Sequence, residues 1–135
     1  MTGLSALVAD PLAGQPLGRE GFVLVEWQDP GGVTGADFPI APLHRHLEDA
    51  EAWYVVSGRL GFRLADETVE VGPGGAVHVP PSVAHTFWNA DPGPTRYVLV
   101  MTPRIKALID GLHALPSRDR ATLEAHFAAH ASELL

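Results

Sequence analysis

The chain of 135 residues contains no cysteine. This absence excludes disulfide bonds, thiolate metal sites and cysteine nucleophiles. Basic residues are also few, because nine Lys and Arg stand against sixteen Asp and Glu, a formal charge of −7 at pH 7. Nucleic acids and anionic membranes attract clustered Lys and Arg, so we expect neither as a partner.

Long apolar runs are missing as well. No stretch approaches the roughly 18 apolar residues that a membrane-spanning helix needs, and residues 1–14 lack the charged and apolar segments of a secretory signal. The lack of disulfides is compatible with the reducing cytoplasm. We therefore expect a soluble, cytoplasmic protein that forms one domain, because its length is close to the modal domain size.

Glycine (14) and proline (12) are plentiful, and they favour short elements joined by turns. Segments rich in β-branched and aromatic residues recur between the turn signals. The expected strands are residues 22–27, 51–56, 60–64, 68–71, 76–79, 84–88 and 97–101, with a further segment that leads through 38–40 into a histidine pair. This pattern predicts a mainly β fold, either a sandwich or a barrel.

Beyond these strands, apolar residues recur at helical spacing in two runs. The runs are marked by Ile105, Leu108, Ile109 and Leu112, and then by Leu123, Phe127 and Leu134. We expect two short helices packed on the outside of a barrel, with Ser117 as the N-cap of the second. The expected organisation is a lead-in over residues 1–18, the barrel over 19–102 and a helical extension over 103–135.

Four side chains suited to metal binding are spread over the expected strands. His44 and His46 are two residues apart, so both side chains point to the same face of a strand. Glu51 and His85 lie on two later strands, and inward-facing sets converge inside a small barrel. Imidazoles with one carboxylate suit a divalent Fe, Mn, Ni, Zn or Cu ion.

The same residues also have a simpler interpretation. A His-x-His pair by itself is more often two polar side chains on the surface of a strand. Glu51 belongs to an acidic cluster with Glu48 and Asp49, and it can equally be a solvated carboxylate. His85 strengthens the case for a metal site, because it lies on a separate expected strand between a proline corner and two aromatic residues.

The spacing of these residues resembles the two sequence motifs of the cupin superfamily. The first motif is carried by His44, His46, Glu51 and Gly58, and the second by Gly74, Pro80, His85 and Asn89. Phe38 and Ser82 stand where the motifs have glycine. The resemblance implies a jelly-roll β-barrel that binds one divalent metal ion through His44, His46, Glu51 and His85.

The resemblance also implies a range of functions. Small cupins with this ligand set resemble metal-dependent dioxygenases and isomerases that act on a small chelating substrate, and Glu51 can additionally serve as a base. A non-catalytic module that binds a metal or a small molecule is the alternative, since fold does not decide function. Cupins of this size commonly pair, so we expect a homodimer, with residues 22–27 as a candidate contact edge.

Several other side chains have two interpretations each. Candidates for the wall of a substrate pocket, which can also be plain core, are Trp53, Phe62, Phe87, Tyr97 and Met101. Asn89 suits a structural turn better than a functional role, and His78 suits a partly exposed or hydrogen-bonded position. His126 and His130 share a helix face, but no third metal ligand accompanies them, so we expect both at the surface.

Overall fold

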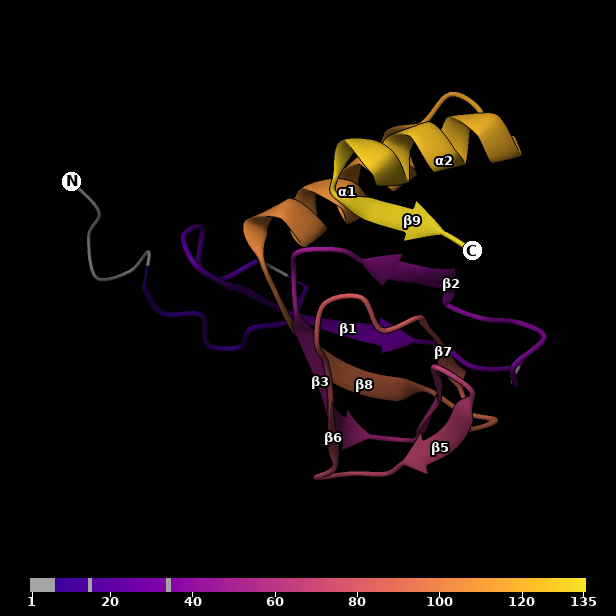
Figure 1. Cartoon of the computed structure of the whole chain (residues 1–135). Helices are drawn as coiled ribbons and strands as arrows, with labels where there is room; N and C mark the ends of the chain where they lie inside the picture. The colour runs from indigo at the N-terminus through magenta and orange to yellow at the C-terminus, as the bar shows by residue number, and fades with distance from the viewer. Residues whose placement is uncertain (1–6, 15, 34) are drawn as a thin grey trace.

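The computed structural model describes residues 7–14, 16–33 and 35–135. Within these residues two antiparallel sheets face each other, with two helices beyond them (Figure 1). The four-stranded sheet has the order β1 (Val23–Asp29), β8 (Thr95–Met101), β3 (Glu51–Ser57) and β6 (Ala76–Val79). The five-stranded sheet has the order β5 (Glu67–Val71), β4 (Leu60–Leu64), β7 (His85–Asn89), β2 (Ala41–His46) and β9 (Ser132–Leu134). The predicted mainly β sandwich is confirmed.

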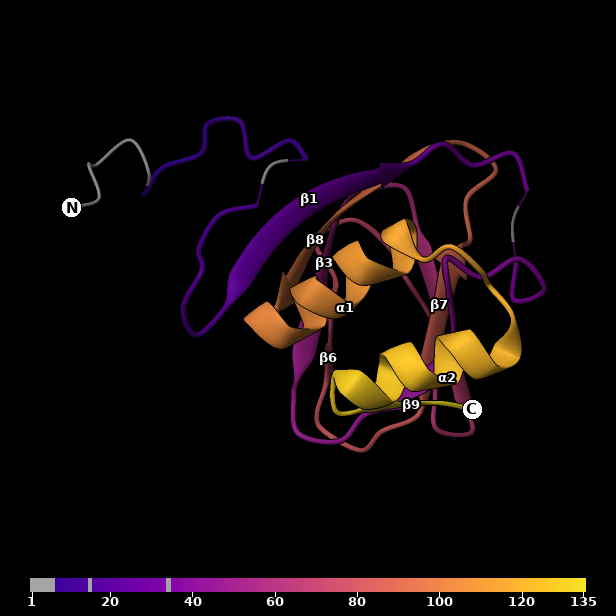
Figure 2. The same ribbon diagram turned by 90° about the horizontal axis from the view of Figure 1, so that it is seen from above.

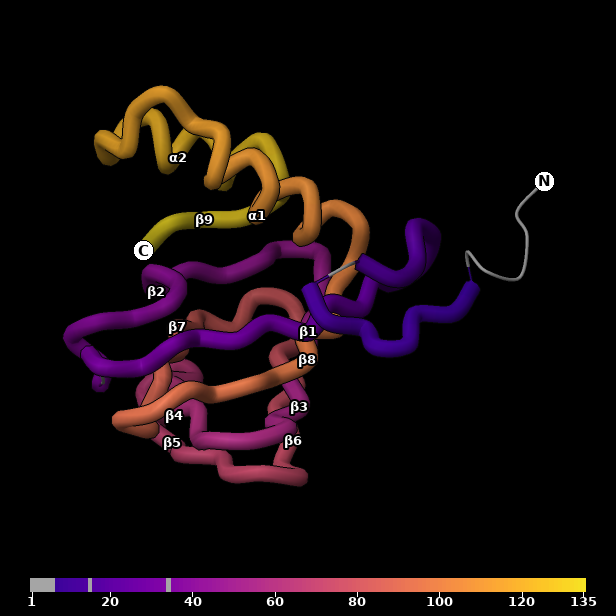
Figure 3. Tube along the Cα trace, turned by 180° about the vertical axis from the view of Figure 1, so that it is seen from behind, coloured from indigo at the N-terminus to yellow at the C-terminus, as the bar shows by residue number. Residues whose placement is uncertain are grey.

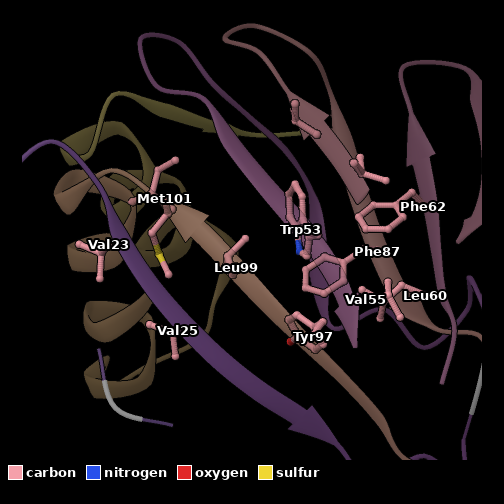
Figure 4. Packing of buried hydrophobic residues seen from close by; sticks show 13 residues of the cluster. Val23, Val25, Trp53, Val55, Leu60, Phe62, Phe87, Tyr97, Leu99 and Met101 are labelled. Carbon is pink, nitrogen blue, oxygen red and sulfur yellow. The ribbon is translucent and has the colours of Figure 1, made fainter. Parts of the chain in front are cut away.

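Apolar side chains that alternate along the strands fill the space between the two sheets. Trp53 of β3 stands beside Leu99 of β8 and Val77 of β6 in the four-stranded sheet. In the other sheet Phe62 is paired with Phe87, and their rings stack at 5.8 Å. Trp53 meets both phenylalanines edge-on, at 5.2 and 5.4 Å, and so joins the sheets (Figure 4).

Helices α1 (Pro103–Ala114) and α2 (Arg120–Ala129) lie across one end of the sandwich (Figure 2). Proline suits the first position of α1, where its missing N–H is not needed, and the Thr102 side chain accepts the hydrogen bond from the backbone N–H of Ile105. The buried faces of the helices carry Ile105, Leu108 and Phe127. In the described part of the chain, no helix is long and apolar enough to span a membrane.

The predicted N-cap of the second helix is wrong. The cap is Asp119, whose carboxylate accepts a hydrogen bond of 2.9 Å from the backbone N–H of Thr122. The Ser117 hydroxyl instead donates to the Asp119 carboxylate. Aspartate at this position also places a negative charge at the positive end of the helix dipole.

Leu134 was predicted to continue the apolar stripe of the second helix, and this is also wrong. The helix ends at Ala129, and Ala131 then adopts a left-handed φ of 52° that turns the chain back. Leu134 lies in β9, opposite His44 of β2. The chain therefore returns from the helices to the sheet, and Figure 3 shows β9 running between α2 and β2.

β1 lies at the edge of its sheet, as the dimer hypothesis requires. Part of this edge is already covered by the lead-in. Leu17 and Leu24 exchange two backbone hydrogen bonds of 2.9 Å, and the Gly14 N–H donates to the Glu26 carbonyl at 2.9 Å. An edge-to-edge contact would have to displace these bonds, and the homodimer stays a prediction.

The turn from β3 to β4 depends on Gly58, which has a left-handed φ of 83°. A Cβ at this position would meet Thr95 Oγ1 and stand 2.7 Å from Thr95 Cα. Thr95 is fully buried, and its hydroxyl accepts from the Arg59 N–H at 3.0 Å while it donates to Asn89 Oδ1 at 2.8 Å. We expect Gly58→Ala to lower the free energy of unfolding by about 3 kcal/mol, as backbone strain and overpacking add.

Urea denaturation of the Gly58→Ala variant measures this loss, and Gly74→Ala is the matched control. Gly74 has nearly the same φ, 84°, but a Cβ there would meet open space. The control should therefore show the backbone strain alone, about 1–2 kcal/mol. Equal losses in the two variants would contradict the proposed clash with Thr95.

Candidate metal centre

The structure brings together the four side chains that the sequence singled out. His44 and His46 come from β2, and His85 begins β7, directly opposite His44 in the register of the two strands. Glu51 begins β3 in the facing sheet. All four residues are buried, and one ligand atom from each lies within 4.8 Å of the others.

Two of the histidines are oriented by backbone carbonyls that lie two residues earlier in the chain. His44 Nδ1 lies 2.6 Å from the carbonyl oxygen of Pro42, and His85 Nδ1 lies 2.9 Å from that of Val83. A carbonyl can only accept, so each Nδ1 carries a proton and donates it. Each Nε2 is left to face the other members of the cluster, as in histidines that bind metals.

Glu51 is the acidic centre of the cluster. Its Oε1 lies 2.8 Å from His85 Nε2 and 3.0 Å from His46 Nε2. Burial by itself would raise the pKa of this carboxyl group, but the hydrogen bonds and charges of His46 and His85 outweigh it and lower the pKa to about 2. The carboxylate is therefore ionised at neutral pH.

His44 is held in the neutral form near pH 7. Burial lowers the pKa of its imidazole to about 4, and the positive charge of His85 adds to this effect. A neutral imidazole whose Nδ1 is hydrogen-bonded offers the lone pair of Nε2 as a metal ligand. The environment of His44 thus keeps it ready to coordinate.

The donor set fits a divalent first-row ion. Neighbouring ligands bound at about 2.1 Å to one ion lie roughly 3 Å apart, and the separations of Glu51 Oε1 from two imidazole nitrogens are 2.8 and 3.0 Å. A buried carboxylate surrounded by imidazoles also needs a cation or protons to balance its charge. Nitrogen and oxygen donors without sulfur suit Zn, Fe, Mn, Ni or Cu(II).

A cavity of about 360 Å³ opens beside this cluster, and His44, His46 and Glu51 form part of its wall. Of the predicted pocket residues, Trp53, Phe87 and Tyr97 lie on the wall. The two helices close its end with apolar side chains. These are Ile105, Leu108, Ile109, Leu112 and Phe127.

The other two predicted pocket residues lie elsewhere among the described residues. Phe62 is fully buried behind Phe87, against which it stacks. Met101 is also buried and borders a smaller hollow near His78. Figure 4 shows Phe62 on the far side of Phe87 from Leu99, and Met101 near the end of β8. Strand parity alone could not separate core from cavity wall.

The match to a known protein family covers the middle of the chain. Residues 30–101, which include all four clustered side chains and just over half of the sequence, match the cupin domain. The chain belongs to the cupin family. The sandwich and the cluster of His44, His46, Glu51 and His85 agree with the motif resemblance in the sequence.

Solved cupin structures resemble this cupin in fold. The cupin domain of Cnp3 from Schizosaccharomyces pombe has a TM-score of 0.55 at 13% identity, over 76% of this chain and 70% of that one. A cupin protein from Bacteroides fragilis has a TM-score of 0.51 at 17% identity, over 61% of this chain and 65% of that one. A cupin-superfamily sugar phosphate isomerase from Silicibacter pomeroyi has a TM-score of 0.51 at 22% identity, over 60% of this chain and 50% of that one.

This cupin therefore spans between half and about two thirds of the length of the last two proteins. At such identities the likeness concerns the fold alone. None of the curated proteins matches the chain.

Ser82 stands where the second cupin motif has glycine, and its backbone adopts a conformation that is unusual for serine. Ser82 has a left-handed φ of 73°, a conformation that glycine adopts without strain. Its N–H donates a hydrogen bond of 2.6 Å to the carbonyl of His46, so the turn stays attached to the strand that carries His44 and His46. The serine thus adopts a left-handed turn conformation that would favour glycine.

Asn89 has the structural position that its sequence context favours. Its side-chain NH₂ donates to Asp29 Oδ1 and to the Gly93 carbonyl, both at 3.0 Å, and its Oδ1 accepts from the Asp91 N–H at 2.8 Å. Asn89 ties the β7–β8 loop to the end of β1. It is buried and is not a member of the cluster of His44, His46, Glu51 and His85.

The remaining histidines of interest also lie outside the cluster. His78 is exposed, as expected. His126 and His130 are half-buried rather than at the surface. His126 Nε2 bonds to the Leu108 carbonyl and His130 Nδ1 to the His126 carbonyl, both at 2.8 Å. The first contact fixes α2 against α1, and the second holds the C-terminal end of α2, so both histidines have a structural role.

Two contacts of the clustered histidines could not be predicted from the sequence. His46 Nδ1 lies 2.7 Å from Ser132 Oγ in β9. The ring of Phe127 packs edge-on against that of His44 at 5.5 Å. The C-terminal segment therefore touches the centre at two of its histidines. No local pattern in the sequence pointed to Ser132, because its contact spans 86 positions.

Proposed function

We propose that this cupin binds one divalent transition-metal ion through His44, His46, Glu51 and His85, and that it acts as a metal-dependent enzyme on a small molecule in the cavity. One observation carries the proposal. His44, His46 and Glu51 belong both to the buried cluster and to the cavity wall, so a molecule in the cavity can reach the centre. Structural metal sites are usually closed by protein ligands, whereas catalytic sites keep an open position.

The cavity wall supports a substrate with an apolar body. Apart from the ligand cluster, the strands contribute Trp53, Phe87, Tyr97 and Leu99 to the wall, and the helices add further aliphatic side chains. A bound divalent ion supplies a Lewis acid that polarises chelating oxygen atoms. An enol or dicarbonyl compound with an apolar remainder fits both features, in a dioxygenase-like or isomerase-like reaction.

The apolar wall fits a sugar phosphate less well. The Silicibacter pomeroyi relative carries the name of a sugar phosphate isomerase. A phosphate needs cationic or N–H donors. Among the described residues of the cavity wall, such donors outside the cluster include Arg118, His113 and Gln28. The Asp29 carboxylate on the same wall would repel a phosphate. Arg118 is exposed, and it donates to the Leu112 carbonyl at 3.2 Å. These observations favour a less polar substrate for this cupin.

The environment of Glu51 supports its role as a ligand more than as a base. A carboxylate with a pKa of about 2 is a weak proton acceptor near neutral pH. To act as a base, Glu51 would have to leave the hydrogen bonds to His46 and His85. We therefore assign Glu51 first to charge balance and coordination.

Metal analysis of protein purified without an affinity tag tests the proposal directly. We expect about one divalent ion per chain, and we expect metal added back to stripped protein to raise the unfolding temperature. At an ion concentration 1,000-fold above Kd the stabilisation should be about 4 kcal/mol. Stripped protein that takes up no Fe, Mn, Ni, Zn or Cu ion would show that the metal assignment is wrong.

Each metal-loaded form is then incubated with apolar 1,2- and 1,3-dicarbonyl compounds, catechols and, for comparison, sugar phosphates. Oxygen uptake and mass-spectrometric product analysis distinguish oxygenation from isomerisation. Turnover of an apolar chelator supports the enzyme. Binding of such compounds without turnover in every metal form would favour the alternative, a non-catalytic binding module.

A further inference from the structure

The last strand of the chain lies against the strand that carries two of the proposed ligands. In the register of β2 and β9, His46 is opposite Ser132 and Arg45 is opposite Glu133. Arg45 donates two hydrogen bonds to Glu133 Oε2, at 3.0 and 2.7 Å. The C-terminal strand is thus held in a fixed register beside β2 (Figure 1).

Ser132 makes the inward contact of this strand. It is 2% exposed, and its Oγ lies 2.7 Å from His46 Nδ1. The hydroxyl also donates to the carbonyl of His130 at 3.0 Å. A hydroxyl has one proton, so the oxygen can only accept from His46, and Nδ1 of the ring must be the donor.

This contact sets the orientation of His46 within the cluster. With Nδ1–H directed at Ser132, the Nε2 of His46 faces Glu51 Oε1 at 3.0 Å. His44 and His85 obtain the same orientation from carbonyls two residues earlier in the chain. His46 instead relies on a side chain that lies 86 positions later.

We propose that Ser132 is a positioning residue of the metal centre, and that β9 is thereby part of the site rather than only an edge of the sheet. The inference rests on the proposed metal binding. Partners that hold the second nitrogen of a metal-binding histidine fix its tautomer and its direction, and their loss typically weakens metal binding about 10- to 100-fold. Ser132 has the burial, the distance and the hydrogen-bond direction that this role needs.

The test uses Co²⁺ as the probe and the full-length, metal-stripped protein. We expect Ser132→Ala to weaken Co²⁺ binding about 10- to 100-fold in competition with a chromophoric chelator. Glu133→Gln is the matched control on the same strand. It weakens the contact with Arg45 and leaves the hydroxyl beside His46 in place, so its Co²⁺ affinity should equal that of the wild type.

A second pair of variants separates the hydroxyl from its packing. Ser132→Thr and Ser132→Val have almost the same shape, but only threonine keeps an oxygen that can accept from His46. We expect the threonine variant to retain most of the Co²⁺ affinity and the valine variant to lose as much as alanine. Equal affinities in the two variants would show that the hydroxyl has no positioning role.

NMR of the metal-free protein gives a readout that does not depend on metal binding. The Nδ1 proton of His46 should exchange slowly with solvent in the wild type and the threonine variant. It should exchange fast in the alanine and valine variants, while the Nδ1 protons of His44 and His85 remain protected.

The outcomes distinguish this inference from the proposed function. Wild-type Co²⁺ affinity in both Ser132→Ala and Ser132→Val would overturn the role of Ser132 and leave the metal centre intact. A wild-type protein that binds no Co²⁺ would overturn both, and this failure is visible before any variant is made.

Discussion

Replacing His85 by alanine is expected to cost this cupin most of its affinity for a divalent metal ion. A protein site with four ligands binds Zn²⁺ with about 10–16 kcal/mol, so one ligand of four carries on the order of 3 kcal/mol, or about 100-fold in affinity. We expect His85→Ala to lower the metal affinity by at least this factor. His85 is fully buried, so water does not readily take its place, and its Nε2 also contacts Glu51. Isothermal titration of stripped protein with Zn²⁺ or Co²⁺ measures the loss.

His78→Ala is the control for this measurement, because His78 is an exposed histidine on a strand of the same sandwich. It should bind the ion as the wild type does. His44→Ala should repeat the loss seen for His85. If His44→Ala and His85→Ala both retained the full metal content at neutral pH, the assignment of the site would be wrong.

The sequence could bring the four clustered residues together because short-range rules place each of them. Alternation along a strand puts His44 and His46 on the same face, and the turn signals placed Glu51 and His85 on separate strands. The resemblance to the cupin motifs joined them into one set. Burial of all four residues agrees with this reasoning.

The C-terminal strand could not be predicted in the same way. Three residues are too few to show a period, and Leu134 continued a helical stripe by coincidence. The pairing of β9 with β2 depends on contacts far apart in the chain, such as Arg45 with Glu133. The role of Ser132 followed from that pairing and had no signal of its own.

Sequence patterns also could not distinguish the residues of the core from those of the cavity wall. Phe62 and Phe87 share the inward direction, yet Phe87 borders the cavity and Phe62 packs behind it. Phe87 lies on β7, next to β2 with its two clustered histidines, whereas Phe62 lies on β4, one strand further away. The helices extend over one end of the sandwich (Figure 2). Phe127 of α2 contacts His44. The C-terminal extension therefore shapes the pocket and the centre together.

The metal-free protein is expected to lose stability steeply in acid. Burial and the charge of His85 lower the pKa of His44 from 6.5 to about 4. Between these two pH values the unfolded chain binds a proton that the folded chain does not, so the free energy of unfolding falls as the pH falls, by about 3 kcal/mol in total. The pKa of Glu51 is lowered from 4.5 to about 2. Its stabilisation, also of about 3 kcal/mol, is present above pH 4.5 and is lost as the pH falls toward 2.

These two losses are together comparable to the whole stability of a typical small domain. Urea unfolding of the stripped protein at pH 7, 5.5 and 4 measures the first part, which belongs to His44. His44→Gln removes that titration and should flatten the dependence between pH 6.5 and 4, whereas His78→Gln at the surface should leave it unchanged. If His44→Gln followed the wild-type slope through this range, the buried neutral imidazole would not be the cause of the acid sensitivity. Bound metal should oppose the loss at neutral pH and be released as protons compete for the ligands.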